Sequence, residues 1–238
     1  QELFGKKGRD FVGIFPLKGK VLNVRNSSVS QISGNKEICN LIKILNLRFG
    51  VDYTKDEEFN TLSYGRLVGL SDQDADGKHI LSLLLNMFHK LFPSLMERKV
   101  PFIYCMLTPL IKIYDKKTEL SFYNIQDYKE HLEKNGGRIK GDIKYLKGLG
   151  SSSNADVKSS FGKKMIEFVK DEKTDDMMDK CFLTKHSDRR KEWIAQYDPV
   201  KNNLKLGKHA FEKVSISEYL DKELIIFSVD DCRRSIAS

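Results

Sequence analysis

The chain has 238 residues, of which 40% are hydrophobic and 31% charged, and its formal net charge is +8. This length allows one or two domains, and the composition is typical of a globular protein. No apolar run approaches the roughly 18 residues that span a bilayer, so the sequence predicts no membrane-spanning segment in this chain. The excess of positive charge favours a polyanionic partner such as nucleic acid.

The cysteines and the start of the chain bear on its cellular compartment. The four cysteines lie far apart, with neither a C-x-x-C pair for zinc nor a dense framework for disulfides. The opening QELFGKKGRDF starts without methionine and has no secretory leader. We therefore expect an intracellular, reducing location and a chain that begins inside a longer protein.

The first half of the chain alternates between strand and helix patterns. Residues 14–24 (IFPLKGKVLNV) predict a basic loop that enters a strand. A helix is predicted next, with Asn35 as its N-cap and apolar residues at helical spacing up to Leu45. A charged, mobile loop is expected over 50–63, followed by a strand at 66–71 and a helix that ends before Pro93.

Four further strands are predicted, together with one more helix at residues 125–134; the strands are 102–107, 110–114, 120–123 and 142–146. Strands that alternate with helices indicate an α/β sheet. Beyond Asn154 the pattern changes to charged helices, which we expect within 158–182, 187–197 and 215–229. The boundary between the two parts is predicted at residue 150.

A cluster of three carboxylates follows the strand predicted at 66–71, in the stretch Ser-Asp-Gln-Asp-Ala-Asp-Gly. This much negative charge is costly unless a cation shares it, and a divalent metal is the natural partner. Two alternatives exist. The cluster is also typical of an acidic turn that caps the next helix. It matches the first six positions of a calcium EF-hand loop, but Leu83 stands where that loop needs glutamate, and a strand precedes it instead of a helix.

Three stretches, FPLKGKVLNVR, SDQDADGKHI and YLKGLGSSS, occur in this order. Together they resemble the signature segments of the eukaryotic-type branch of type IIA DNA topoisomerases. The later stretches DRRKEW, KELIIFS and RSIAS are similar to the segment that joins the TOPRIM module of these enzymes to a winged-helix domain. Departures such as Gly-Lys-His and RSIAS indicate a divergent lineage, for example that of a large DNA virus.

The resemblance implies a TOPRIM fold, which is Rossmann-like, with a mostly parallel sheet flanked by helices, followed by a mainly helical linker. Residues 1–150 would be a metal-binding TOPRIM module that lacks its first strand. Residues 151–238 would be a helical segment that leads to a winged-helix domain absent from this sequence.

The resemblance also implies roles for particular residues. Asp72, Asp74 and Asp76 would hold Mg²⁺, or alternatively Mn²⁺, beside the scissile phosphate. The lysines and glycines of two loops would contact DNA: Lys18, Gly19, Lys20, Lys147, Gly148 and Gly150. A solvated basic loop and an ordinary turn are the simpler interpretations of these loops. His79 would support the site, although Lys78 precedes it where the family has serine.

The family's enzymes are ATP-dependent homodimers that cut double-stranded DNA, pass a second duplex through the break and reseal it. Their catalytic Glu lies in an E-G-D-S stretch and their nucleophilic Tyr follows an arginine, and neither pattern occurs here. We therefore expect the catalytic residues and the ATP site outside this chain, which alone should be inactive. The location would be the nucleus or a viral replication site in the cytoplasm.

Two other functions remain open on the sequence. Another TOPRIM enzyme, a primase or nuclease, is the first, and PLKGK and KGLG argue against it. A noncatalytic calcium-binding module is the second, and Leu83 argues against it.

Overall fold

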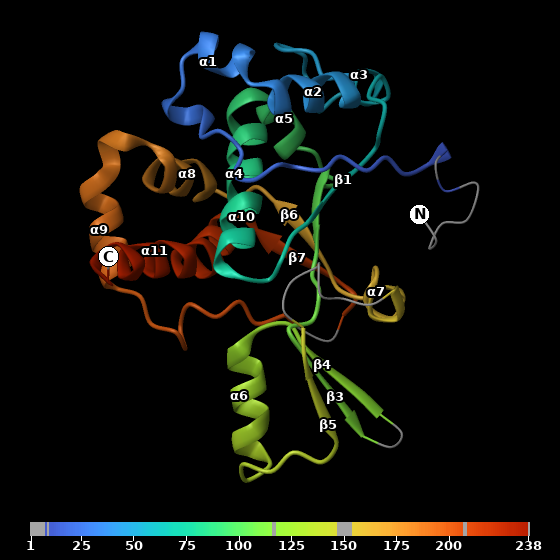
Figure 1. Cartoon of the computed structure of the whole chain (residues 1–238). Helices are drawn as coiled ribbons and strands as arrows, with labels where there is room; N and C mark the ends of the chain where they lie inside the picture. The colour runs from blue at the N-terminus through green and yellow to red at the C-terminus, as the bar shows by residue number, and fades with distance from the viewer. Residues whose placement is uncertain (1–7, 9, 116–117, 147–153, 207–208, 238) are drawn as a thin grey trace.

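The computed structural model describes residues 8, 10–115, 118–146, 154–206 and 209–237 (Figure 1). They form a four-stranded sheet with helices packed around it and a separate three-stranded sheet. None of the helices in these ranges combines the length and apolar character needed to cross a membrane.

The main sheet has the strand order β1-β2-β6-β7. Its strands are β1 (Leu67–Leu70), β2 (Ile103–Met106), β6 (Met165–Val169) and β7 (Phe211–Ser215). The pairs β1/β2 and β6/β7 are parallel, and β2/β6 is antiparallel. Every residue of β2 is buried, as expected for a central strand covered on both faces.

The helices before β2 are η2 (Val24–Asn26, a 3₁₀ turn), α1 (Val29–Gly34), α2 (Lys36–Leu45), α3 (Asp56–Phe59), α4 (Ala75–Leu91) and α5 (Pro93–Met96). Those of the second half are α7 (Asn154–Ser160), α8 (Thr174–Phe182), η4 (Thr184–His186), α9 (Ser187–Ala195), α10 (Ile216–Tyr219), the π-helical turn η5 (Leu220–Leu224) and α11 (Ile225–Ala237). Helix α4 is central to the core, since Leu85, Met87 and Phe88 are fully buried.

The smaller sheet is antiparallel, with the order β4-β3-β5, and comprises β3 (Ile111–Asp115), β4 (Thr118–Phe122) and β5 (Asp142–Tyr145). Helix α6 (Ile125–Lys134) lies beside it, and Figure 1 shows this unit at one end of the molecule, away from α4.

The predicted fold class is confirmed, and several elements match closely. Helix α2 begins where predicted, because the Asn35 side chain accepts a hydrogen bond from the Ile38 backbone N–H at 3.0 Å. The strand and helix on either side of the acidic cluster are β1 and α4. The loop expected over 50–63 contains the short helix α3.

The prediction of a strand within residues 14–24 is wrong. This segment pairs with no strand in the described part of the chain, and its last residue, Val24, begins the η2 turn. Val21 and Val24 are nevertheless buried, at 5% and 1% exposure. The alternating apolar pattern is therefore satisfied by packing against the core and not by a hydrogen-bonded ladder.

The helical interpretation of residues 158–182 also needs correction, because β6 separates α7 from α8. A short apolar run such as MIEFV fits a buried strand or a buried helix equally well, and periodicity alone does not separate them. Neighbouring strands β2 and β7 decide the outcome here. The second half of the chain is mainly helical, but it also supplies two strands of the main sheet.

Candidate functional site

The acidic loop is a tight turn between β1 and α4. Asp74 is the N-cap of α4, and its side chain accepts a hydrogen bond from the Gly77 backbone N–H at 2.8 Å. Gly77 faces the Asp72 backbone so closely that a Cβ on it would lie 2.0 Å from the Asp72 carbonyl oxygen. The capping interpretation is therefore correct for Asp74. An EF-hand is excluded, because the strand β1 leads into the loop.

Asp76 connects the acidic loop to the predicted basic loop. Its carboxylate lies 3.0 Å from Lys20 Nζ and 3.3 Å from a guanidinium nitrogen of Arg234 on α11. The hydrogen bond from Lys20 is the main cause that lowers the pKa of Asp76, and the bond from Arg234 acts in the same direction. Three of the segments that carry the resemblance, those of Lys20, Asp76 and Arg234, thus meet at this carboxylate.

The other predicted residues are placed as follows. Lys18 and Gly19 are exposed, and the Lys18 backbone N–H donates to Glu37 Oε1 at 2.9 Å. Lys147, Gly148 and Gly150 lie outside the described residues. Within the ranges that the structure describes, no three His, Cys, Asp or Glu side chains are gathered as a metal site. The assignment of a metal to Asp72, Asp74 and Asp76 stays a prediction.

His79 stacks on Phe227 of α11, with ring centroids 3.9 Å apart and 27° between the ring planes. Its Nδ1 is buried and has no hydrogen-bond partner among the described atoms. Burial, and next the charge of Lys20, lower the pKa of His79 to about 4. At neutral pH His79 is therefore an uncharged packing residue that supports the start of α4.

The pKa of His79 predicts a loss of stability in acid. Because the unfolded chain binds a proton near pH 6.5 and the folded chain only near pH 4, the free energy of unfolding should decrease as pH falls through this range. We expect a decrease of about 1–2 kcal/mol from this residue after allowance for solvent screening. Urea titrations in EDTA at several pH values should show a shallower pH dependence for His79→Phe. The control His209→Gln, at an exposed histidine, should keep the wild-type dependence.

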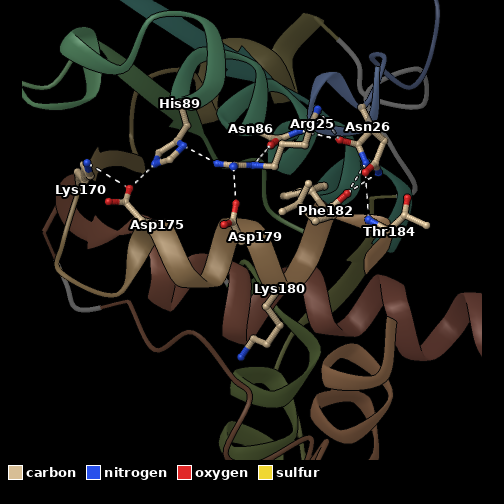
Figure 2. Close-up of polar contacts among 12 residues, drawn as sticks. Arg25, Asn26, Asn86, His89, Lys170, Asp175, Asp179, Lys180, Phe182 and Thr184 are labelled. Carbon is tan, nitrogen blue, oxygen red and sulfur yellow. Dashed lines mark hydrogen bonds and ion pairs between the residues drawn. The ribbon is translucent and has the colours of Figure 1, made fainter. Parts of the chain in front are cut away.

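A buried arginine anchors the segment that carries the basic loop (Figure 2). The Arg25 side chain is 8% exposed and donates from Nε to Asn86 at 2.7 Å and from Nη1 to Asp179 at 2.6 Å. Its Nη2 contacts His89 Nδ1 at 2.6 Å. Arg25 thereby connects η2 to both α4 and α8.

The same network fixes the protonation of His89. A guanidinium only donates hydrogen bonds, so His89 Nδ1 accepts and Nε2 carries the proton that it shares with Asp175, 2.7 Å away. Burial is the main cause that lowers the pKa of His89. The imidazole is therefore held neutral between Arg25 and Asp175, and Lys170 Nζ contacts the same Asp175 oxygen, Oδ1, at 3.2 Å.

Three residues of this region, Arg25, Phe227 and Arg234, were not among the predicted site residues. Each lies in a stretch that carries the resemblance, namely FPLKGKVLNVR, KELIIFS or RSIAS. Their place in these stretches was the signal that could have identified them. Their contacts could not be predicted, because their partners lie far away along the chain and no local pattern identifies them.

Comparison with known proteins gives a consistent result. Residues 106–232 match the family described as the C-terminal associated domain of TOPRIM. The chain is 38% identical to DNA topoisomerase 2 of Invertebrate iridescent virus 6, over 97% of the chain and 21% of that protein. It is 41% identical to DNA topoisomerase 2 of Arabidopsis thaliana, over 97% of the chain and 16% of that protein.

A solved structure agrees with the sequence relatives. The DNA-binding, cleavage and re-ligation domain of Plasmodium falciparum topoisomerase II superposes with a TM-score of 0.80 and 36% identity, over 92% of this chain and 30% of that one. The chain thus spans between 16% and 21% of the length of the two curated relatives named above. It belongs to the family of the C-terminal associated domain of TOPRIM, and the relatives named above are type II DNA topoisomerases.

Proposed function

We propose that this chain is the part of an ATP-dependent type II DNA topoisomerase that binds Mg²⁺ and DNA beside the scissile phosphate. The observation that carries this proposal is the contact between Lys20 and Asp76, which joins the basic loop to the acidic loop. A lysine next to metal-binding carboxylates is suited to bind a phosphate that the metal also contacts.

The donor set fits a hard divalent cation. Carboxylate oxygens are the ligands that Mg²⁺ prefers, and Asp72, Asp74 and Asp76 provide them in one tight turn. Lys20 and Arg234 lower the pKa of Asp76 and keep its carboxylate ionised, which is the form that binds a divalent cation. When bound, Mg²⁺ would stabilise charge on the attacking and leaving oxygens of the phosphoryl transfer, and Mn²⁺ would serve in its place.

The site would be completed by other parts of the protein. Strand β1 lies at the edge of the sheet, with Val68 and Leu70 each 47% exposed. We propose that this edge pairs with a further strand that carries the catalytic Glu, and that the nucleophilic Tyr also lies outside this chain. The chain alone would then bind Mg²⁺ weakly and would not relax DNA.

The remaining DNA contacts would come from Lys18, which is exposed, and from the loop of Lys147, Gly148 and Gly150. The full-length protein would act as a homodimer on double-stranded DNA and hydrolyse ATP elsewhere. It would work inside the cell, in the nucleus or at a viral replication site.

The substitution Asp74→Asn tests the metal site without disturbing the cap. Asparagine caps a helix about as well as aspartate, so stability should change by less than about 1 kcal/mol. In the full-length protein, Mg²⁺-dependent DNA cleavage should fall at least about a hundredfold, because a charged ligand is lost. Asp188→Asn, at an exposed aspartate of α9, should leave cleavage unchanged. Full cleavage by the Asp74→Asn protein would refute the metal assignment.

A further inference from the structure

One side of the C-terminal helix contacts the first turn of α4, immediately after the acidic loop. Glu223 in η5 and Phe227 in α11 stand four residues apart and so lie on the same helix face. Their partners, Lys78 and His79, are adjacent residues of α4. Two turns further along, Arg234 contacts Asp76 itself. One side of this helical segment thus contacts three residues of the acidic motif and the helix start, Asp76, Lys78 and His79.

The pair Lys78–Glu223 is largely shielded from solvent. Lys78 Nζ lies 2.7 Å from Glu223 Oε2, and the two side chains are 12% and 11% exposed. Removing two charges from water is costly, so such a pair is weak evidence for stability and better suited to fixing one arrangement of the elements that carry it. Lys78 is also the residue at which this chain departs from the serine of the resembled motif.

The helix is distorted where Glu223 lies. The five residues Leu220–Leu224 form a π-helical turn between α10 and α11. Such a turn inserts an extra residue into the helical repeat and often occurs at functional sites. It rotates the side chains that follow relative to those before it, and in this chain Glu223 lies within the turn and faces α4.

Phe227 supports the same turn of α4 from a neighbouring position. Its side chain is 8% exposed, and His79 stacks on its ring. Lys20 Nζ lies 4.6 Å from the centroid of that ring, in cation–π geometry. One aromatic side chain therefore contacts both the helix that begins at Asp74 and the lysine that pairs with Asp76.

We propose that Glu223 and Phe227 are positioning residues for the metal site, which hold the first turn of α4 so that Asp74 and Asp76 keep the arrangement that binds the cation. This inference rests on the proposed metal site. Because η5 and α11 belong to one helical segment near the C-terminal end of the chain, a displacement of α11 would be transmitted to the aspartates through these contacts.

The test is Mn²⁺ binding to the 238-residue chain, measured by electron paramagnetic resonance, which detects weak binding. Glu223→Gln leaves Lys78 without its carboxylate, and Phe227→Leu keeps an apolar side chain but removes the ring. Each should raise the Kd for Mn²⁺ about tenfold, as is typical when a residue that orients metal ligands is replaced. Phe227→Leu also serves as the second variant if Glu223→Gln does not fold.

The double variant Lys78→Ser/Glu223→Gln leaves no unpaired buried charge and should recover part of the affinity for Mn²⁺.

A matched control separates positioning from general destabilisation. Glu212→Gln breaks another shielded ion pair, with Lys164 at 3.2 Å, on β7 at the opposite edge of the sheet from β1. It should lower the melting temperature but leave the Kd for Mn²⁺ unchanged. Wild-type Kd values in folded Glu223→Gln and Phe227→Leu would overturn the inference. By contrast, a wild-type chain whose Mn²⁺ binding does not depend on Asp74 would refute the proposed metal site itself.

Discussion

Replacing Gly77 with alanine should prevent the acidic loop from forming. The added Cβ would lie 2.0 Å from the Asp72 carbonyl oxygen and 2.9 Å from its carbonyl carbon, and both neighbours are backbone atoms. A flexible side chain could move aside, but here the turn itself must open, which also removes the bond between Gly77 N–H and Asp74. We expect a loss of at least about 3 kcal/mol in the free energy of unfolding.

Equilibrium unfolding in urea measures this loss, and Gly65→Ala is the matched control. Gly65 precedes β1, has no positive φ, and a Cβ on it would meet no atom within 4 Å. Its replacement should change stability by less than about 1 kcal/mol. If Gly77→Ala unfolds at the wild-type urea concentration, the close approach of the two backbone segments is not a feature of the native loop.

Arg25→Lys should destabilise the chain by about 3 kcal/mol, because breaking a buried, hydrogen-bonded charge network leaves its members unpaired. Lysine keeps the charge but lacks the planar fork that serves three acceptors at once. Asn86, which is fully buried, and His89 Nδ1 would lose their donor. The segment that carries Lys18 and Lys20 would lose its anchor, so weaker DNA binding should accompany the lower stability.

Urea unfolding and a DNA-binding titration at fixed salt test this expectation. Arg48→Lys is the control, since Arg48 is 53% exposed and pairs with Glu58 at 2.7 Å on the surface. Exposed ion pairs contribute at most about 1 kcal/mol, so the control should behave like the wild type. A loss for Arg25→Lys as small as that of the control would show that the network in Figure 2 contributes little.

The parts of the fold that the sequence predicted well depend on neighbouring residues. Asn35 caps α2 through a bond to a residue three positions later, and the apolar residues at helical spacing predict α4, which is buried on all sides from Leu81 to Phe88. The acidic loop could equally be predicted from the sequence, because its three aspartates and Gly77 lie within one short stretch. Such features are visible in sequence because the interacting groups are a few residues apart.

The features that the sequence did not predict depend on distant partners. Arg25 bonds to residues 61, 64 and 154 positions away, and no local pattern selects them. Residues 14–24 have the alternation of a strand but no neighbouring strand with which to pair in the described structure. The run MIEFV becomes β6 because β2 and β7 lie on either side of it.

The sequence by itself therefore determined the fold class, the start of α4 and the motifs that resemble those of the type II topoisomerases. Only the tertiary structure decided that Lys20 meets Asp76, that Arg25 connects three elements, and that Glu223 and Phe227 contact the turn that carries the aspartates. The physical reason is that helix caps and tight turns are local, whereas ion pairs and ring contacts form between side chains that the packed core brings together.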